Sequence, residues 1–197
     1  MGNRAVITTK DETMGVYLHW NGGYDSVNAF LKYCALQDFR SPSEDLTYGF
    51  ARLTQVICNF FGSGLSCGVG PMNKLDCNNG DNGVYIIEGW NIVGRKYHDG
   101  PEQNEYQLNE MLYEINERQP EKMKFTKEEI DAECAQRGWV GPKYKKGDKV
   151  LVSSPNQKEK MEGVITDSWE INGEQGYTVK LEDGTYWFLA ESQVEKC

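Results

Sequence analysis

Residues 16–36, VYLHWNGGYDSVNAFLKYCAL, constrain the fold most because they carry three structural signals in succession. An apolar run at 16–20 is followed by Asn-Gly-Gly, and apolar residues then recur at positions 27, 30, 31, 34 and 35. That spacing places the apolar side chains on one face of an amphipathic helix. The glycines allow a tight turn before the helix. The segment therefore predicts a strand, a glycine turn and a helix, with Asp25 as the helix N-cap.

The junction between this strand and helix gathers five polar or aromatic residues, namely His19, Trp20, Asn21, Tyr24 and Asp25. His19 could act as a general base oriented by the carboxylate of Asp25, and the other three could contact a partner. The alternative is a turn with a purely structural role, because most junctions of this kind carry no activity.

The order of the other elements predicts an α+β domain over residues 1–119. Strands are expected at 4–9, 15–20, 84–88 and 92–97, and helices at 26–37, 43–61 and 105–118. Strands grouped in hairpins and helices grouped between them predict an antiparallel sheet with helices on one face. The stripe that includes Phe50, Leu53 and Ile57 makes the second helix the most apolar one, so we expect it in the core.

The composition changes after Gln119. Residues 120–143 contain a capping box and glycine-proline, and we interpret them as a helical linker. Residues 144–197 alternate short apolar runs with turn signals, which is typical of a small β-barrel of the Tudor type. Tyr177, Tyr186 and Trp187 could form an aromatic binding site there, or they could simply fill the small core.

Residues 62–83 are rich in glycine and asparagine and include Asp76 and Asp81. A loop of this length is often functional, and its many side-chain oxygens allow a calcium interpretation. The spacing differs from an EF-hand, because the sixth position, which requires glycine, is Asp81. We therefore favour a turn-rich approach to the next hairpin, with Asp76 and Asp81 available to a partner, and expect no metal site.

The net charge of −9 arises from 21 basic and 30 acidic residues. This charge disfavours direct binding to nucleic acid and suits a partner with a basic surface. Acidic pairs such as Glu44 and Asp45 could contribute to that binding. No apolar run reaches the roughly 20 residues of a membrane helix, and the N-terminus lacks a signal-peptide core. We expect a cytoplasmic protein whose six cysteines are free thiols.

Three stretches, MGNRAVIT, LHWNGGYDSV and LDCNNGDNGVYIIEGWNIVGR, resemble a family of small proteins carried by phages and mobile elements of Gram-positive bacteria. The resemblance covers residues 1 to about 120. It implies a counter-defence role of the anti-CRISPR kind in a bacterial host cell. The family defines no catalytic residues that can be transferred to this chain.

Two functional hypotheses follow. The first is an inhibitor that binds a host defence protein or ribonucleoprotein, such as an RNA-guided nuclease, through acidic surfaces. The second is an enzyme that cleaves a guide RNA or a signal molecule, using His19, Asp25 and the carboxylates of 76–82. We favour the first hypothesis, because there are only two histidines and no Walker, HExxH or GxGxxG pattern. For the same reason we expect no cofactor.

Overall fold

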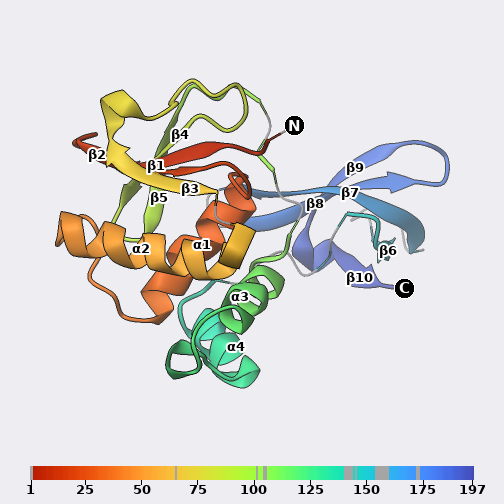
Figure 1. Cartoon of the computed structure of the whole chain (residues 1–197). Coiled ribbons are helices and arrows are strands. Elements are labelled where there is room, and N and C mark those ends of the chain that lie inside the picture. Colours follow the sequence, from red (N-terminus) through yellow and green to blue (C-terminus); the bar gives the residue numbers. More distant parts are fainter. Residues whose placement is uncertain are drawn as a thin grey trace. The chain divides into compact units, whose positions relative to one another are not determined.

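The computed structural model describes residues 2–64, 66–100, 102–103, 106–139, 144, 146–153, 160–171 and 174–197. The chain forms two compact units, Met1–Trp139 and Val140–Cys197 (Figure 1). The overall class is α+β, with two five-stranded sheets and four α-helices among the described residues.

The first unit contains a mixed sheet with the strand order β3-β2-β1-β4-β5. Its strands are β1 (Ala5–Thr9), β2 (Met14–Leu18), β3 (Cys67–Pro71), β4 (Val84–Glu88) and β5 (Asn91–Lys96). The β1–β2 and β4–β5 hairpins confirm the two predicted pairs. The prediction of a purely antiparallel sheet is wrong, because β1 and β4 are parallel neighbours. The β3 strand also lies inside the segment that we predicted as a loop.

The helices of this unit are α1 (Tyr24–Leu36), α2 (Leu46–Phe61), α3 (Leu108–Glu117) and α4 (Lys127–Gln136). Short 3₁₀ turns occupy Gly62–Gly64, Met72–Lys74 and Glu121–Met123. Both α1 and α2 lie on one side of the sheet (Figure 1). One core joins this side of the sheet to the helices, and it includes Ile7, Leu18, Phe30, Tyr85 and Ile87. The predicted core residues Phe50, Leu53 and Ile57 are confirmed, with exposed fractions of 1%, 0% and 0%.

The second face of the sheet is covered by the segment that follows β3. A Cβ atom built on Gly15 of β2 would lie 2.8 Å from the sulfur of Met72 and 3.0 Å from a methyl carbon of Leu75. A side chain at position 15 would therefore have to displace the Met72 and Leu75 side chains. The cover also explains why all five residues of β1 are buried.

The predicted linker over 120–143 needs correction, because residues up to Trp139 belong to the first unit. Ile130 and Cys134 of α4 are buried in the core of that unit, and Phe125 and Trp139 pack against it. The hydroxyl of Tyr33 on α1 lies 2.8 Å from the backbone oxygen of Met123. The capping box of Thr126 and Glu129 is confirmed at the start of α4.

The second unit is a five-stranded antiparallel sheet with the order β10-β6-β7-β8-β9. Its elements are β6 (Lys149–Val152), β7 (Met161–Ile171), β8 (Glu174–Leu181), β9 (Tyr186–Ala190), a 3₁₀ turn (Glu191–Gln193) and β10 (Val194–Lys196). Its core includes Val150, Val152, Ile165, Val179 and Leu189. The described strands form an open sheet that ends at β10 and β9, so the predicted closed barrel is not shown.

Among the described helices, none has both the length and the apolar character needed to cross a membrane. The six cysteines are free, as predicted. The sulfur atoms of Cys58 on α2 and Cys67 on β3 lie 3.2 Å apart. Burial and the neighbouring Cys58 raise the pKa of the Cys67 thiol to about 12, so the thiol is protonated at neutral pH.

Candidate functional site

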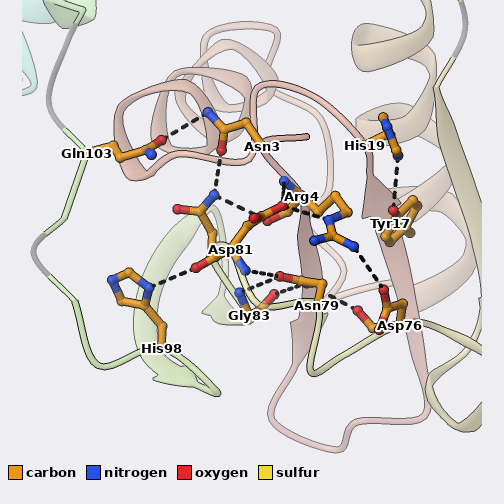
Figure 2. A network of polar contacts seen from close by, with 11 residues as sticks. Asn3, Arg4, Tyr17, His19, Asp76, Asn79, Asp81, Gly83, His98 and Gln103 are labelled. Carbon is orange, nitrogen blue, oxygen red and sulfur yellow. Dashed lines mark hydrogen bonds and ion pairs between the residues drawn. The ribbon is translucent and has the colours of Figure 1, made fainter. Parts of the chain in front are cut away.

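A polar cluster joins the N-terminal strand to the asparagine-rich loop (Figure 2). We call it the Arg4 cluster and define it as Arg4, Asp76, Asn79, Asp81 and Asn82. The Arg4 side chain donates from Nε to Asp81 Oδ2 over 2.6 Å, and the Arg4 backbone N–H donates to the same oxygen over 3.1 Å. Arg4 Nη1 lies 3.7 Å from Asp76 Oδ2. The hydrogen bond from Arg4 lowers the pKa of the Asp81 carboxyl, so this pair is ionised at neutral pH.

Asn79 organises the loop from within and is only 4% exposed. Its Oδ1 atom accepts from the backbone N–H groups of Asp81 and Gly83, each over 3.1 Å. Its Nδ2 atom donates to the backbone oxygens of Asp76 over 3.1 Å and Gly83 over 3.3 Å. Gly83 has a φ of +60°, and a Cβ atom there would lie 2.2 Å from the oxygen of Lys96, so only glycine fits. These contacts fix the backbone conformation of the loop directly before β4.

Two of the loop oxygens that suggested calcium, Asn79 Oδ1 and Asp81 Oδ2, are thus engaged with N–H groups of the protein itself. Asn82 contributes a donor to the same network, because its Nδ2 atom donates to the backbone oxygen of Arg4 over 3.2 Å. Among the described residues, no group of three or more histidine, cysteine, aspartate or glutamate side chains is arranged to hold a metal ion. Asp76 and Asp81, which we predicted as partner contacts, bind Arg4 instead.

We expect Asn79→Ala to destabilise the first unit by about 1–3 kcal/mol, because buried backbone groups lose their partners. Chemical denaturation of the full chain measures this change. Asn78→Ala is the matched control, since Asn78 is the exposed neighbour of the same residue type, and it should be nearly neutral. Equal losses in both variants would show that Asn79 does not organise the loop.

The predicted strand–turn–helix junction is present, but α1 begins at Tyr24 with Gly23 as its N-cap. The prediction that Asp25 is the N-cap is therefore wrong, and Asp25 lies in the first helical turn. A Cβ atom on Gly22 would lie 2.6 Å from the backbone oxygen of Asn3, so the turn packs closely against the N-terminal strand. Asn21 adopts a φ of +53°, which allows this reversal.

In the described contacts, His19 and Asp25 interact with different parts of the molecule. His19 Nδ1 lies 3.3 Å from the Tyr17 hydroxyl (Figure 2). Its ring packs edge-on against Trp20, with the ring centroids 5.0 Å apart. Asp25 accepts from the backbone N–H of Ser26 over 2.6 Å and of Tyr106 over 3.0 Å. These contacts make Asp25 a structural connection between α1 and the segment before α3.

Of the aromatic residues proposed at this junction, Trp20 is 43% exposed and remains accessible to a partner. Tyr24 packs against the core instead. Asn21 Nδ2 lies 3.5 Å from the Ser26 hydroxyl, a contact within the turn itself.

Glu44 and Asp45, predicted as partner contacts, organise the start of α2. Asp45 is its N-cap and accepts from the backbone N–H of Tyr48 over 3.1 Å, while Arg40 Nη1 lies 3.2 Å from its second oxygen. Glu44 accepts from the backbone N–H and the hydroxyl of Ser41, each over 2.8 Å. These hydrogen bonds lower the pKa of the Glu44 carboxyl. The expected start of this helix at residue 43 is corrected accordingly, because α2 begins at Leu46.

The aromatic site predicted in the second unit also needs correction. Tyr177 is fully buried, and its hydroxyl accepts from the backbone N–H of Tyr144 over 3.0 Å and lies 2.7 Å from Glu191 Oε2. Trp187 packs against the same core. Tyr186, the third residue of the predicted site, is 53% exposed, and Phe188, which was not predicted, is 75% exposed. The alternation along a strand that exposes them is a signal present in the sequence.

Sequence reasoning missed a second polar group, formed by Arg95, His98 and Glu102. Arg95 Nη1 lies 2.7 and 2.6 Å from the two carboxylate oxygens of Glu102, and its guanidinium lies 3.7 Å from the centre of the Tyr85 ring. The His98 side chain is only 12% exposed. Its Nδ1 lies 3.3 Å from the backbone oxygen of Asp81 (Figure 2). The spacing of these residues follows no motif that would have identified the group.

An acidic row was also missed. Glu110, Glu114 and Glu117 are exposed and recur at i, i+4 and i+7 along α3, so they share one face. The helix contains no basic residue. Like charges at this spacing oppose helix formation by about 0.2–0.5 kcal/mol per pair. Lys124 Nζ lies 3.9 Å from Glu117 Oε2 and offsets part of this repulsion, and a basic partner would relieve more of it.

Comparisons of the chain with protein-family models, with curated proteins and with solved structures found no significant match.

Proposed function

We propose that the protein acts by binding a macromolecular partner with a basic surface. The observation that carries the proposal is the acidic row on α3. Residues 1–139 contain 13 basic and 20 acidic residues, which gives this unit a charge of −7, whereas residues 140–197 contribute −2. The acidic residues that we first selected stabilise the fold through Arg4, Arg40 and Ser41. We choose the row on α3 as the docking surface because it places three exposed carboxylates on one face. Glu117 also lies 3.9 Å from Lys124 Nζ, a contact on the protein surface.

We further propose that the partner is a host defence component, namely an RNA-guided nuclease in the cytoplasm of a bacterial host. The support for this step is the resemblance of the N-terminal sequence to proteins of phages and mobile elements. Charge complementarity also supports it, since the channels of such nucleases are basic to hold nucleic acid. A protein placed in that channel would exclude the target DNA.

We also propose that the second unit curls into a small, partly open barrel of the Tudor type, in which β9 keeps a free edge. The support is the order β10-β6-β7-β8-β9, in which the last strand returns to the first, and the register shift between Ile165 and Asp167. A shift of this kind bends a strand and increases its twist.

The test uses the purified full chain and a purified nuclease–guide RNA complex, with cleavage of target DNA as the readout. We expect inhibition by the wild type and its loss when Glu110, Glu114 and Glu117 are all replaced by lysine. Binding should weaken with added salt, because exposed charges are screened over about 10 Å at 0.1 M. The triple substitution should slow association more than it speeds dissociation.

A control variant carries the same change of charge at scattered exposed positions, Glu88, Asp99 and Glu162. It should retain most of the inhibition. An equal loss of inhibition in both variants would mean that only the net charge matters and that the position of the row on α3 does not. The guide RNA is then examined on a denaturing gel with the wild type and with His19→Ala. Intact RNA during full inhibition supports binding. Shortened RNA that His19→Ala no longer produces would replace this proposal with an enzymatic one.

A further inference from the structure

Strand β9 combines a free edge with exposed aromatic side chains. It is the last strand in the sheet order, and β8 is its only partner among the described strands. Tyr186 and Phe188 are exposed, whereas Leu189 is buried and Trp187 packs against the core. One face of β9 therefore belongs to the core and the other presents two aromatic rings.

The register shows where the backbone groups of β9 point. The backbone N–H of Leu181 donates to the oxygen of Thr185 over 2.9 Å, which makes these two residues a hydrogen-bonded pair. Such pairs alternate with non-hydrogen-bonded pairs along an antiparallel ladder. Lys180–Tyr186 and Thr178–Phe188 are the non-hydrogen-bonded pairs, so the N–H and C=O groups of Tyr186 and Phe188 point toward the free edge.

The contact of Ala190 agrees with this assignment. Ala190 is the next residue in the alternation, and its backbone N–H donates to a side chain outside the ladder, Gln193 Oε1, over 3.0 Å. An edge that presents free backbone groups is a template for another strand.

The exposed rings continue into an apolar patch on the same face of the sheet. Val164 of β7 pairs with Lys180 of β8, which pairs with Tyr186 of β9, so the three side chains form a row across the strands. Val164 is 38% exposed, and the ammonium of Lys180 lies 5.7 Å from the centre of the Tyr186 ring. Side chains of an added strand would rest beside this row.

The charges beside β9 indicate which kind of segment can bind at its free edge. Residues 180–191 contain three acidic residues and one basic residue, Lys180. Glu182 and Asp183 precede the strand, and Glu191, which accepts from the Tyr177 hydroxyl, follows it. Hydrogen bonds from Thr185 lower the pKa of the Asp183 carboxyl, so it is charged at neutral pH. A second copy of β9 would bring like charges together, whereas a basic segment would neutralise them.

We infer that the edge of β9 binds an extended, basic segment of a protein partner, which adds to the sheet as a further strand. Main-chain hydrogen bonds to Tyr186 and Phe188 would hold the segment, and its alternate apolar side chains would pack against the two rings. The inference rests on the proposal that the protein binds a basic protein partner, and it adds a surface separate from the row on α3.

The experiment titrates the full chain with a capped nine-residue peptide of alternating lysine and valine. A peptide with glutamate in place of lysine is the control probe. We expect the lysine peptide to bind and the glutamate peptide to bind much more weakly. On binding, hydrogen exchange should slow at the amides of Tyr186 and Phe188 but not at Trp187, whose amide is already bonded to β8.

Phe188→Thr keeps a residue that favours strands and should weaken binding by roughly tenfold or more, as expected for an aromatic anchor. Val93→Thr is the matched control, because Val93 is an exposed apolar residue on β5 in the other unit. It should bind the peptide like the wild type. Circular dichroism of both variants verifies that they are folded.

Several results would overturn the inference. These are no binding of the lysine peptide, equal binding by Phe188→Thr, or unchanged exchange at Tyr186 and Phe188. Self-association that Phe188→Thr abolishes would assign the edge to a second copy and would equally overturn it.

The inference and the proposed function can fail separately. If the α3 variant loses nuclease inhibition while the peptide does not bind, the proposed function stands without the inference. If the peptide binds at β9 but the wild type does not inhibit the nuclease, the β9 binding site is supported. The proposed nuclease target is then rejected.

Discussion

A fragment that ends at Trp139 should fold stably, whereas a fragment that ends at Gln119 should lose most or all of its cooperative folding. The shorter fragment lacks Met123, Ile130 and Cys134, which are buried in the first core. Full burial of an apolar side chain contributes about 1.5–3 kcal/mol. The combined loss is therefore comparable with the total stability of a typical domain, about 5–15 kcal/mol.

The truncation also removes hydrogen-bond partners from buried groups that remain. Tyr33 loses the backbone oxygen of Met123, and Asn116 loses its two contacts with the backbone of Phe125. Buried groups left without partners cost about 1–3 kcal/mol each. Thermal unfolding of the two fragments followed by circular dichroism measures the difference. Equal melting temperatures would mean that α4 is only a linker.

Leu53→Ala should lower the free energy of unfolding of the first unit by about 2–5 kcal/mol, the range for a buried leucine. Leu53 lies in the middle of α2 and is completely buried. The substitution leaves a cavity between the helix and its neighbours, which the surrounding side chains fill only in part.

The matched control is Leu46→Ala at the first residue of the same helix, where the leucine is only half-buried. This change should cost clearly less, because fewer contacts are lost. Urea unfolding of the full chain, with the transition of the first unit analysed separately, gives both values. An unchanged midpoint for Leu53→Ala would mean that this face of α2 does not pack in the core.

The sequence by itself determined most elements of this protein. The apolar stripes of α1, α2 and α3 and the hairpins β1–β2 and β4–β5 follow from periodicity and turn residues, which act over a few neighbouring positions. The capping box at Thr126 is equally local. The same patterns indicated five strand-like runs in the second unit, although the curvature of the sheet depends on long-range packing.

Only the tertiary structure decided how these elements combine. The parallel pairing of β1 with β4 joins residues about 80 positions apart, and β3 is a strand because β2 offers it an edge, despite its glycines. The assignment of α4 to the first unit depends on Ile130 and Cys134, whose burial requires the whole core.

The candidate site shows the same division. The sequence located acidic and aromatic residues, but it did not show which of them have partners within the protein. Asp81 is paired with Arg4, Asp45 caps α2 and Tyr177 is buried, whereas Glu114 and Phe188 remain exposed. The physical reason is that a charge or a ring becomes available to a partner only when no other part of the chain folds onto it, and that depends on contacts between distant residues.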